Sequence, residues 1–120
     1  MNTIFIVDDS DTNLATAEEA LEDHYNVMTM PSAAKMFSLL DKISPNLILL
    51  DIEMPEMNGF EALERLRANN TWANIPVLFL TGTIDASIEE RSKTLGAAGI
   101  ILKPFSAPVL VRQIEAFIKQ

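Results

Sequence analysis

The feature that most limits the possible folds of this chain is an apolar run that ends at a carboxylate. Residues 47–50 contain no polar side chain and are followed at once by Asp51. A run of strand length without polar alternation is typical of a strand covered on both faces, as in a parallel sheet. The chain then turns at Pro55 and at Asn58-Gly59 before a new amphipathic segment begins. The pattern places Asp51 at the carboxyl edge of a sheet, where open α/β folds bind their ligands.

Four further apolar or β-branched runs have the length of strands, namely residues 3–7, 25–30, 77–80 and 100–102. Five segments with apolar residues at helical spacing alternate with the runs: one ending near residue 23, then 31–40, 60–67, 86–95 and 106–118. Strictly alternating strands and helices favour a parallel sheet with right-handed crossovers. We therefore predict a three-layer, doubly wound α/β domain spanning residues 1–120. Its five-stranded parallel sheet has the flavodoxin-like order 2-1-3-4-5 and is accompanied by five helices.

The apolar spacing also assigns side chains to helix faces. In the last helix we expect four side chains to face the core: Leu110, Ile114, Phe117 and Ile118. In the third helix we expect the charged side chains to face solvent: Glu61, Glu64, Arg65 and Arg67. The segment 86–95 has little more than Ile88 and Leu95 to bury. We therefore expect the fourth helix to be held weakly and to be able to move.

Composition excludes several classes of protein. No apolar run is long enough to span a bilayer, and no secretory signal precedes the first strand. The chain has no cysteine, which excludes disulfides and thiolate metal sites. Its net charge of -8 argues against non-specific binding to nucleic acid. We therefore expect a cytoplasmic domain that binds neither membrane nor nucleic acid directly.

Polar residues follow four of the five predicted strands. Asp8 and Asp9 follow the first, Asp51 the third, Thr81 the fourth and Lys103 the fifth. Taken singly, each has an ordinary explanation as a turn, cap or solvated residue. In the predicted strand order, however, neighbouring strands lie about 4.8 Å apart, so the carboxylates converge and the threonine flanks them. The fifth strand is about 10 Å from the third, a gap that only a long side chain bridges.

Three carboxylates in one pocket need compensating charge. At about 5 Å and an effective dielectric near 20, each pair repels by roughly 3 kcal/mol. A divalent cation together with Lys103 would balance Asp8, Asp9 and Asp51. Oxygen ligands without cysteine or histidine select a hard ion, Mg²⁺ or alternatively Mn²⁺. A cation and a lysine beside a carboxylate are the parts needed to transfer a phosphoryl group onto Asp51.

The segments FIVDDS, LILLDIEMPEMNGFE, VLFLTG and ILKPF, in this order and at these strand ends, resemble the receiver domain of bacterial two-component response regulators, of the chemotaxis-regulator type. The resemblance covers the whole chain. It implies that Asp51 is the phosphoacceptor, phosphorylated by a sensor histidine kinase or a phosphotransfer protein. It implies that Asp9 and Asp51 bind Mg²⁺ directly, that Asp8 acts through water, and that the backbone carbonyl of Glu53 is a further ligand.

The resemblance extends to the switch and its output. Thr81 corresponds to the switch hydroxyl and Lys103 to the phosphate-binding lysine, and the Lys103-Pro104 peptide bond is expected to be cis. The expected role is a signalling phosphoacceptor that catalyses only its own Mg²⁺-dependent phosphorylation and dephosphorylation. Phosphorylation would change the face formed by the fourth helix, fifth strand and fifth helix. That face would control an output domain beyond residue 120 or a separate partner, or would pair two copies of the chain.

Two positions depart from the usual pattern of the family. Ile100 stands three residues before the lysine, where many receivers have a switch aromatic, so we expect transmission to depend more on Thr81 and the fourth helix. Glu53 stands two residues beyond the acceptor and is a candidate for tuning access of water or donor, with a solvated loop glutamate as the equal alternative. Thr83, two residues beyond Thr81, is a further tuning candidate.

Two other functions use similar parts. Haloacid-dehalogenase-like phosphotransferases also have a strand-end aspartate nucleophile, but they usually have a second aspartate where this chain has Glu53. A flavodoxin-like carrier or nucleotide binder would need a phosphate-binding first turn. Here that turn is acidic and lacks a glycine-rich loop, so it would repel phosphate without a metal.

Overall fold

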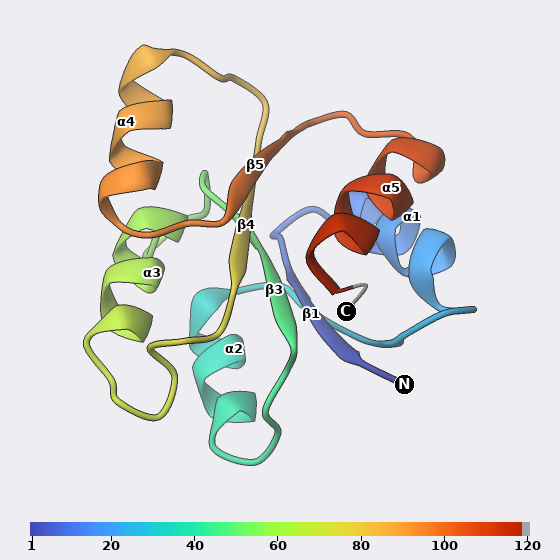
Figure 1. The fold of residues 1–120 in the computed structure, drawn as a ribbon, viewed down its shortest axis with the longest axis horizontal. Helices are drawn as coiled ribbons and strands as arrows, with labels where there is room; N and C mark the ends of the chain where they lie inside the picture. The colour runs from blue at the N-terminus through green and yellow to red at the C-terminus, as the bar shows by residue number, and fades with distance from the viewer. Residues whose placement is uncertain (119–120) are drawn as a thin grey trace.

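The strands form one parallel sheet in the order β2-β1-β3-β4-β5, which confirms the predicted topology. The computed structural model describes residues 1–118, so residues 119 and 120 of the predicted domain lie outside the described part (Figure 1). The elements are β1 Thr3–Val7, α1 Asp11–Leu21, β2 Asn26–Met30, α2 Ala33–Leu40, β3 Leu47–Asp51, α3 Gly59–Arg67, β4 Val77–Thr81, α4 Ala86–Thr94, β5 Gly99–Leu102 and α5 Ala107–Ile118. None of these helices is long and apolar enough to cross a membrane.

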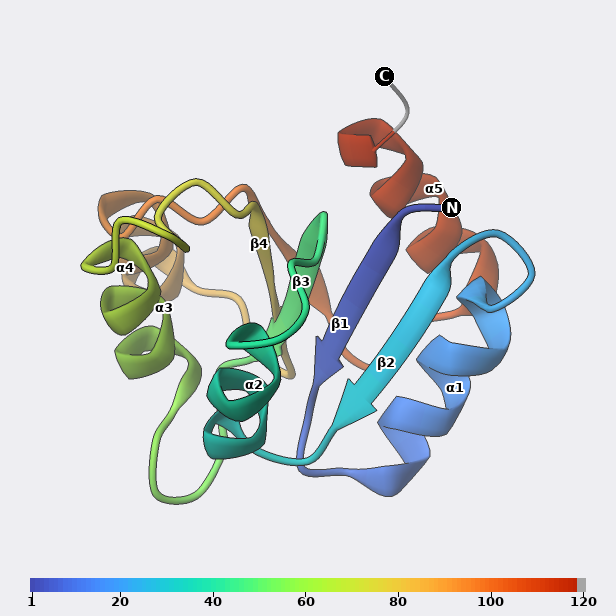
Figure 2. The same cartoon turned by 90° about the horizontal axis from the view of Figure 1, so that it is seen from below.

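Helices cover both faces of the sheet, as Figures 1 and 2 show. Successive side chains of a strand point to opposite faces, so each central strand contributes to two cores. One core lies between the sheet and α1 and α5, and its strand residues include Ile6, Leu49 and Leu80. The other lies under α2, α3 and α4 and includes Val7 and Leu50. Burial on both faces explains why β3 has no polar alternation.

Side-chain caps fix where four of the helices begin. Ser10, Ser32 and Asp85 accept a hydrogen bond from a backbone N–H in the first turn of α1, α2 and α4, respectively. Asn58 does the same for α3, and the Asn58 N–H donates to the Glu61 side chain, which completes a capping box. Each cap stands a short distance after a strand, so it sets the length of the loop at the carboxyl edge of the sheet.

Helix α4 is attached by few buried groups. Ser92 is its only buried residue, and Ile88 is half-buried. The Arg91 guanidinium lies 4.3 Å from the centre of the Phe60 ring on α3, a cation–π contact that adds to the attachment. This sparse packing matches the low apolar content of the segment and gives α4 few contacts to lose if it moves.

Two predicted helix-face assignments are wrong. Phe117 is 38% exposed, because the last turn of α5 lies at the amino ends of the strands, where the ring borders Gly99 and lines a surface cavity with Asn2 and Asn46. Arg67 is half-buried and is turned toward backbone groups. Its guanidinium donates to the carbonyl oxygens of Ile75 and Gly96, each at 3.0 Å, and burial lowers the pKa of this arginine. The long arginine stem lets a residue at the end of α3 reach the loops before β4 and after α4.

We expect Arg67→Ala to lower the free energy of unfolding by about 1–2 kcal/mol, because two carbonyl groups lose a charged donor. Arg112, which is exposed on α5, offers a matched control, and Arg112→Ala should change stability by less than about 0.5 kcal/mol. Urea denaturation followed by circular dichroism measures both values. Equal stability of the two variants would contradict the role assigned to Arg67.

Gly59 is required by a close approach of backbone. A Cβ atom at this position would lie 2.4 Å from the carbonyl oxygen of Asp51 and 2.9 Å from the Cα of Ile52. We expect Gly59→Ala to destabilise the fold by about 2 kcal/mol, because the backbone must move to make room for the Cβ atom. The higher helix propensity of alanine offsets only part of this destabilisation. A Cβ at Gly82 meets nothing within 4 Å, so Gly82→Ala is the control. If thermal unfolding gives both variants the same midpoint, the steric explanation is wrong.

Candidate functional site

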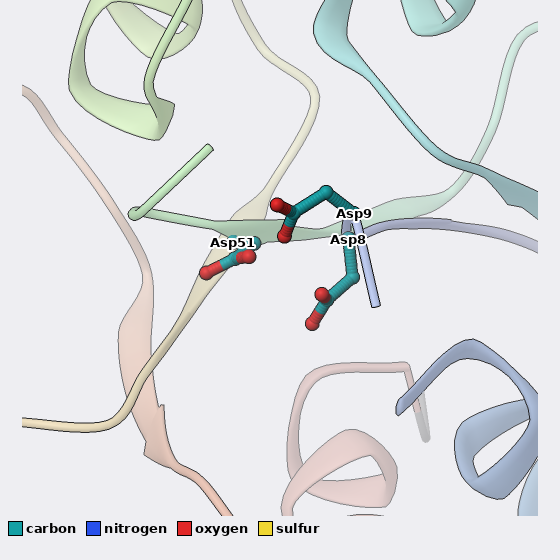
Figure 3. A group of neighbouring side chains, drawn as sticks. All are labelled: Asp8, Asp9 and Asp51. Carbon is teal, nitrogen blue, oxygen red and sulfur yellow. The ribbon is translucent and has the colours of Figure 1, made fainter. Parts of the chain in front are cut away.

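Three carboxylates meet at the carboxyl edge of the sheet. Asp8 and Asp9 directly follow β1, and Asp51 is the last residue of β3, the strand beside it. One carboxylate oxygen from each residue lies within 4.8 Å of the other two, and Figure 3 shows the side chains gathered around one point. Asp8 and Asp51 are buried, whereas Asp9 is exposed. We refer to this group of two buried carboxylates and one exposed carboxylate as the acidic cleft.

Lys103 reaches this cluster from the end of β5. Its Nζ lies 2.9 Å from Asp51 Oδ1 and 3.5 Å from Asp8 Oδ2, and only 16% of its side chain is exposed. Its backbone N–H donates to the Thr81 carbonyl at 2.7 Å, which holds the start of the β5–α5 loop against β4. The Lys103-Pro104 peptide bond is cis. The lysine spans the gap between the fifth and third strands, and its cationic end sits between the two buried carboxylates.

The two oxygens of Asp51 have different surroundings. Oδ1 accepts hydrogen bonds from Lys103 and, at 3.2 Å, from the backbone N–H of Glu53. Oδ2 is buried and has no hydrogen-bond partner among the described residues. Buried polar atoms nearly always have a partner, so an unpaired carboxylate oxygen in an acidic cleft marks a position open to a cation or an electrophile.

Asp8 is held in place by its own neighbours. Its Oδ1 accepts the Ser10 N–H at 2.9 Å, and its Oδ2 accepts the Asn13 side-chain amide at 3.2 Å. The sequence analysis missed Asn13. Asn13 is the third residue of α1, a position from which a side chain can reach back toward the residues before the helix. This position in the sequence could have indicated the contact with Asp8. These bonds fix the Asp8 carboxylate so that it faces Asp51.

Burial and charge act together on the cluster. Burial is the largest influence on Asp51 and, with the negative charge of Asp8, raises its pKa to about 7, although Lys103 and the Glu53 N–H oppose the shift. Burial alone would lower the pKa of Lys103, but its hydrogen bond to Asp51 and the charges of Asp51 and Asp8 outweigh burial and raise it. The lysine therefore stays charged at neutral pH, and one ammonium does not fully compensate the carboxylates. The cleft attracts further positive charge.

Thr81, at the end of β4, belongs to a second group of hydrogen bonds that adjoins the cluster. Its buried hydroxyl lies 2.9 Å from Glu53 Oε2 and 3.0 Å from the Thr83 carbonyl oxygen, and it accepts the Thr83 N–H at 3.2 Å. The sequence placed Glu53 and Thr83 near the site through the resemblance alone. It did not reveal that the glutamate side chain turns toward the threonine, because no spacing encodes a contact between two loops.

Ile100 lies outside the acidic cleft. It is half-buried on β5, opposite Phe79 of β4. Together with Ile84 it lines two surface cavities, one of about 270 Å³ between α4 and β5 and one of about 460 Å³ between β5 and α5. The position that carries an aromatic in many receivers therefore has a compact aliphatic side chain with open space on both sides.

Comparison with known proteins agrees with this site. The family model for the response regulator receiver domain matches residues 4–115. A probable cyclic di-GMP phosphodiesterase of Vibrio cholerae is 35% identical over 98% of this chain, which spans only 26% of that protein's length. The polar-differentiation response regulator DivK of Brucella ovis is 28% identical, with 97% of this chain and 95% of that protein covered.

A solved structure extends the likeness to three dimensions. The chemotaxis protein CheY4 of Vibrio cholerae has a TM-score of 0.94 and 27% sequence identity, and the match covers 98% of this chain and 99% of that one. Residues 4–115, which the family model matches, include β1 from Ile4 onward, the other four strands in full, and Asp8, Asp9 and Asp51. The chain therefore belongs to the response regulator receiver family of two-component signalling, whose members act as phosphoacceptors.

Proposed function

We propose that Asp51 accepts a phosphoryl group from a phosphohistidine of a sensor histidine kinase or a phosphotransfer protein. The observation that carries the proposal is the buried Asp51 carboxylate, which has one oxygen held by Lys103 and the other without a partner. In the transfer, a carboxylate oxygen of Asp51 forms a bond to phosphorus as the bond from phosphorus to the histidine nitrogen breaks. The bonding electrons return to that nitrogen. Water later attacks the same phosphorus and releases inorganic phosphate and the free carboxylate.

The residues around Asp51 support this chemistry by position and charge. Lys103, at 2.9 Å, neutralises negative charge that gathers on the phosphoryl oxygens during transfer. Asp8 is fixed by Ser10 and Asn13, so it cannot turn away from the cleft. We propose that the domain catalyses only its own phosphorylation and dephosphorylation, without turnover of a separate substrate.

Receiver domains in general bind Mg²⁺ through acidic residues, and this chain has such a cluster. The carboxylate oxygens of the cluster are suitable ligands for the ion. Oxygens from three residues lie within 4.8 Å of one another, and one buried oxygen of Asp51 is unpaired. We propose Asp9 and Asp51 as direct ligands, Asp8 as a ligand through water and the backbone carbonyl of Glu53 as a further ligand, with Mn²⁺ as a substitute ion. When bound, the ion would supply positive charge to the phosphoryl oxygens.

The signal would leave the site through Thr81 and Lys103. Phosphorylation changes the charge of Asp51 from -1 to about -2 and adds three acceptor oxygens. The Thr81 hydroxyl and the Lys103 ammonium could donate hydrogen bonds to these oxygens. Because Thr81 is bonded to Thr83, a shift of Thr81 would move the loop that leads to α4. Because α4 is attached by few buried groups, we propose that it responds by changing position.

The signal would reach other proteins through the face formed by α4, β5 and α5. We propose that residues 1–120 act as one receiver domain in the cytoplasm and that α4, β5 and α5 present the changed surface. That surface would serve a separate partner, an output domain beyond residue 120 or a second copy of the chain. Four exposed apolar side chains on or beside these elements support the proposal: Ile84, Leu102, Val109 and Phe117.

Phosphorylation can be tested directly by incubating the protein with acetyl phosphate and Mg²⁺ and measuring its intact mass. We expect the wild type to gain one phosphoryl group and Asp51→Asn to gain none, because the amide lacks the nucleophilic oxygen. Asp41→Asn removes an exposed carboxylate at the end of α2 and should keep the gain. Continuous release of phosphate from a phosphate ester, with no modified protein, would instead favour a phosphatase.

The raised pKa of Asp51 predicts that Mg²⁺ affinity depends on pH. Below about pH 7 the carboxyl holds a proton, and the ion must displace it to bind. The dissociation constant should therefore increase as pH falls from 8 to 5, approaching about tenfold per pH unit at the acidic end. Calorimetry in two buffers of different ionisation enthalpy should detect the released proton.

The matched control for this titration is Asp51→Asn, which should bind Mg²⁺ weakly and release no proton at this position. A wild-type dissociation constant that stays the same between pH 5.5 and pH 8 would contradict the assignment of Asp51 as a ligand with a raised pKa.

A further inference from the structure

The Thr81 hydroxyl is already engaged by protein groups in the unmodified domain. Its oxygen accepts the Thr83 N–H at 3.2 Å, and its single hydrogen has two acceptors within reach. These acceptors are Glu53 Oε2 at 2.9 Å and the Thr83 carbonyl oxygen at 3.0 Å. A hydroxyl has one proton to donate, so donation to either acceptor excludes donation to a phosphoryl oxygen.

The Glu53 acceptor differs from the Thr83 carbonyl in two ways. It is charged, and hydrogen bonds to charged acceptors are stronger than those to neutral ones. It also comes from a different loop, since Glu53 follows β3 whereas Thr81 and Thr83 lie at the end of β4 and just beyond it. The Glu53–Thr81 bond therefore ties the loop after β3 to the end of β4, the neighbouring strand.

We infer that Glu53 is a positioning residue, a latch that holds the Thr81 hydroxyl away from the phosphoryl position until Asp51 is modified. The inference rests on the proposed function and gives Glu53 a role beyond a solvated loop residue. The Glu53 backbone N–H donates to Asp51 Oδ1, so its side chain starts beside the group that is modified. Added negative charge on Asp51 repels the Glu53 carboxylate and attracts the Thr81 hydroxyl, and both effects break the same bond.

Two substitutions of Glu53 separate the latch from simple charge repulsion. Glu53→Gln removes the charge but keeps a side-chain oxygen that can accept from Thr81. Glu53→Ala removes both the charge and the acceptor. Because Glu53 is exposed, neither change opens a cavity in the core, and both variants are expected to fold.

The first measurement needs no phosphate. Three-bond NMR couplings to the Thr81 methyl carbon report the side-chain rotamer in the unmodified protein. We expect one dominant rotamer in the wild type and in Glu53→Gln, and averaging over rotamers in Glu53→Ala. An unchanged single rotamer in Glu53→Ala would overturn the latch, since the Thr83 carbonyl would then suffice to hold the hydroxyl.

The second measurement uses beryllofluoride with Mg²⁺ as a stable mimic of the phosphoryl group, titrated by NMR. We expect Glu53→Ala to bind the mimic about fivefold more tightly than Glu53→Gln, the effect of one net hydrogen bond. When Thr81→Ala is added to both variants, they should bind the mimic with equal affinity, because the hydroxyl that Glu53 holds is absent. Thermal unfolding of each variant verifies that it is folded under the conditions of the titration.

The outcomes separate the latch from the proposed function. Equal binding by Glu53→Ala and Glu53→Gln in the presence of Thr81, or the same ratio in both backgrounds, would overturn the latch. Glu53 would then act on the phosphoryl group or on access of water directly. Failure of the wild type to bind the mimic would overturn the proposed function. The coupling measurement would still decide whether Glu53 holds Thr81.

Discussion

The structure depends on how two buried carboxylates share one lysine. Asp8 and Asp51 are removed from water, and Lys103 is the ammonium group within 3.5 Å of both. This arrangement is stable only because each acidic side chain has further donors, from the Ser10 and Glu53 backbone N–H groups and the Asn13 amide. The remaining imbalance is concentrated on one unpaired oxygen of Asp51. Lys103 therefore balances only part of the negative charge of the site.

The fold places a sparsely buried helix beside a fully covered central sheet. The central strands β1, β3 and β4 are buried on both faces, so the residues at their ends are fixed by two cores rather than by their loops. Helix α4 lies beside this sheet with a single buried residue. Its far end is joined to α3 by the bond from Arg67 to Gly96, whereas its first turn follows the loop that leaves Thr81. The end of α4 that follows the site is therefore not the end that the Arg67 bond holds.

The sequence predicted the sheet and the acidic cleft because both follow from local patterns. Fully apolar runs mark buried parallel strands, and once the strand order is known the residues after each strand must share an edge. The sequence did not predict the contacts of Asn13, Arg67 and Glu53, or the exposure of Phe117. Each of these depends on where a long or terminal side chain meets another loop or the edge of the sheet. These contacts depend on the tertiary structure, and no periodic pattern in the sequence indicates them.

Thr81 is hydrogen-bonded to residues of the three loops near Asp51. Its hydroxyl contacts Glu53 after β3, it exchanges hydrogen bonds with Thr83 on the way to α4, and its carbonyl accepts the Lys103 N–H after β5. Ile100, with open space on both sides, lacks the bulk and polar group of an aromatic switch residue. The Thr81 hydroxyl is thus bonded to Glu53 and Thr83, and the Thr81 backbone carbonyl is bonded to Lys103. A series of hydrogen bonds therefore runs from Asp51 through Glu53 and Thr81 to the loops that precede α4 and follow β5.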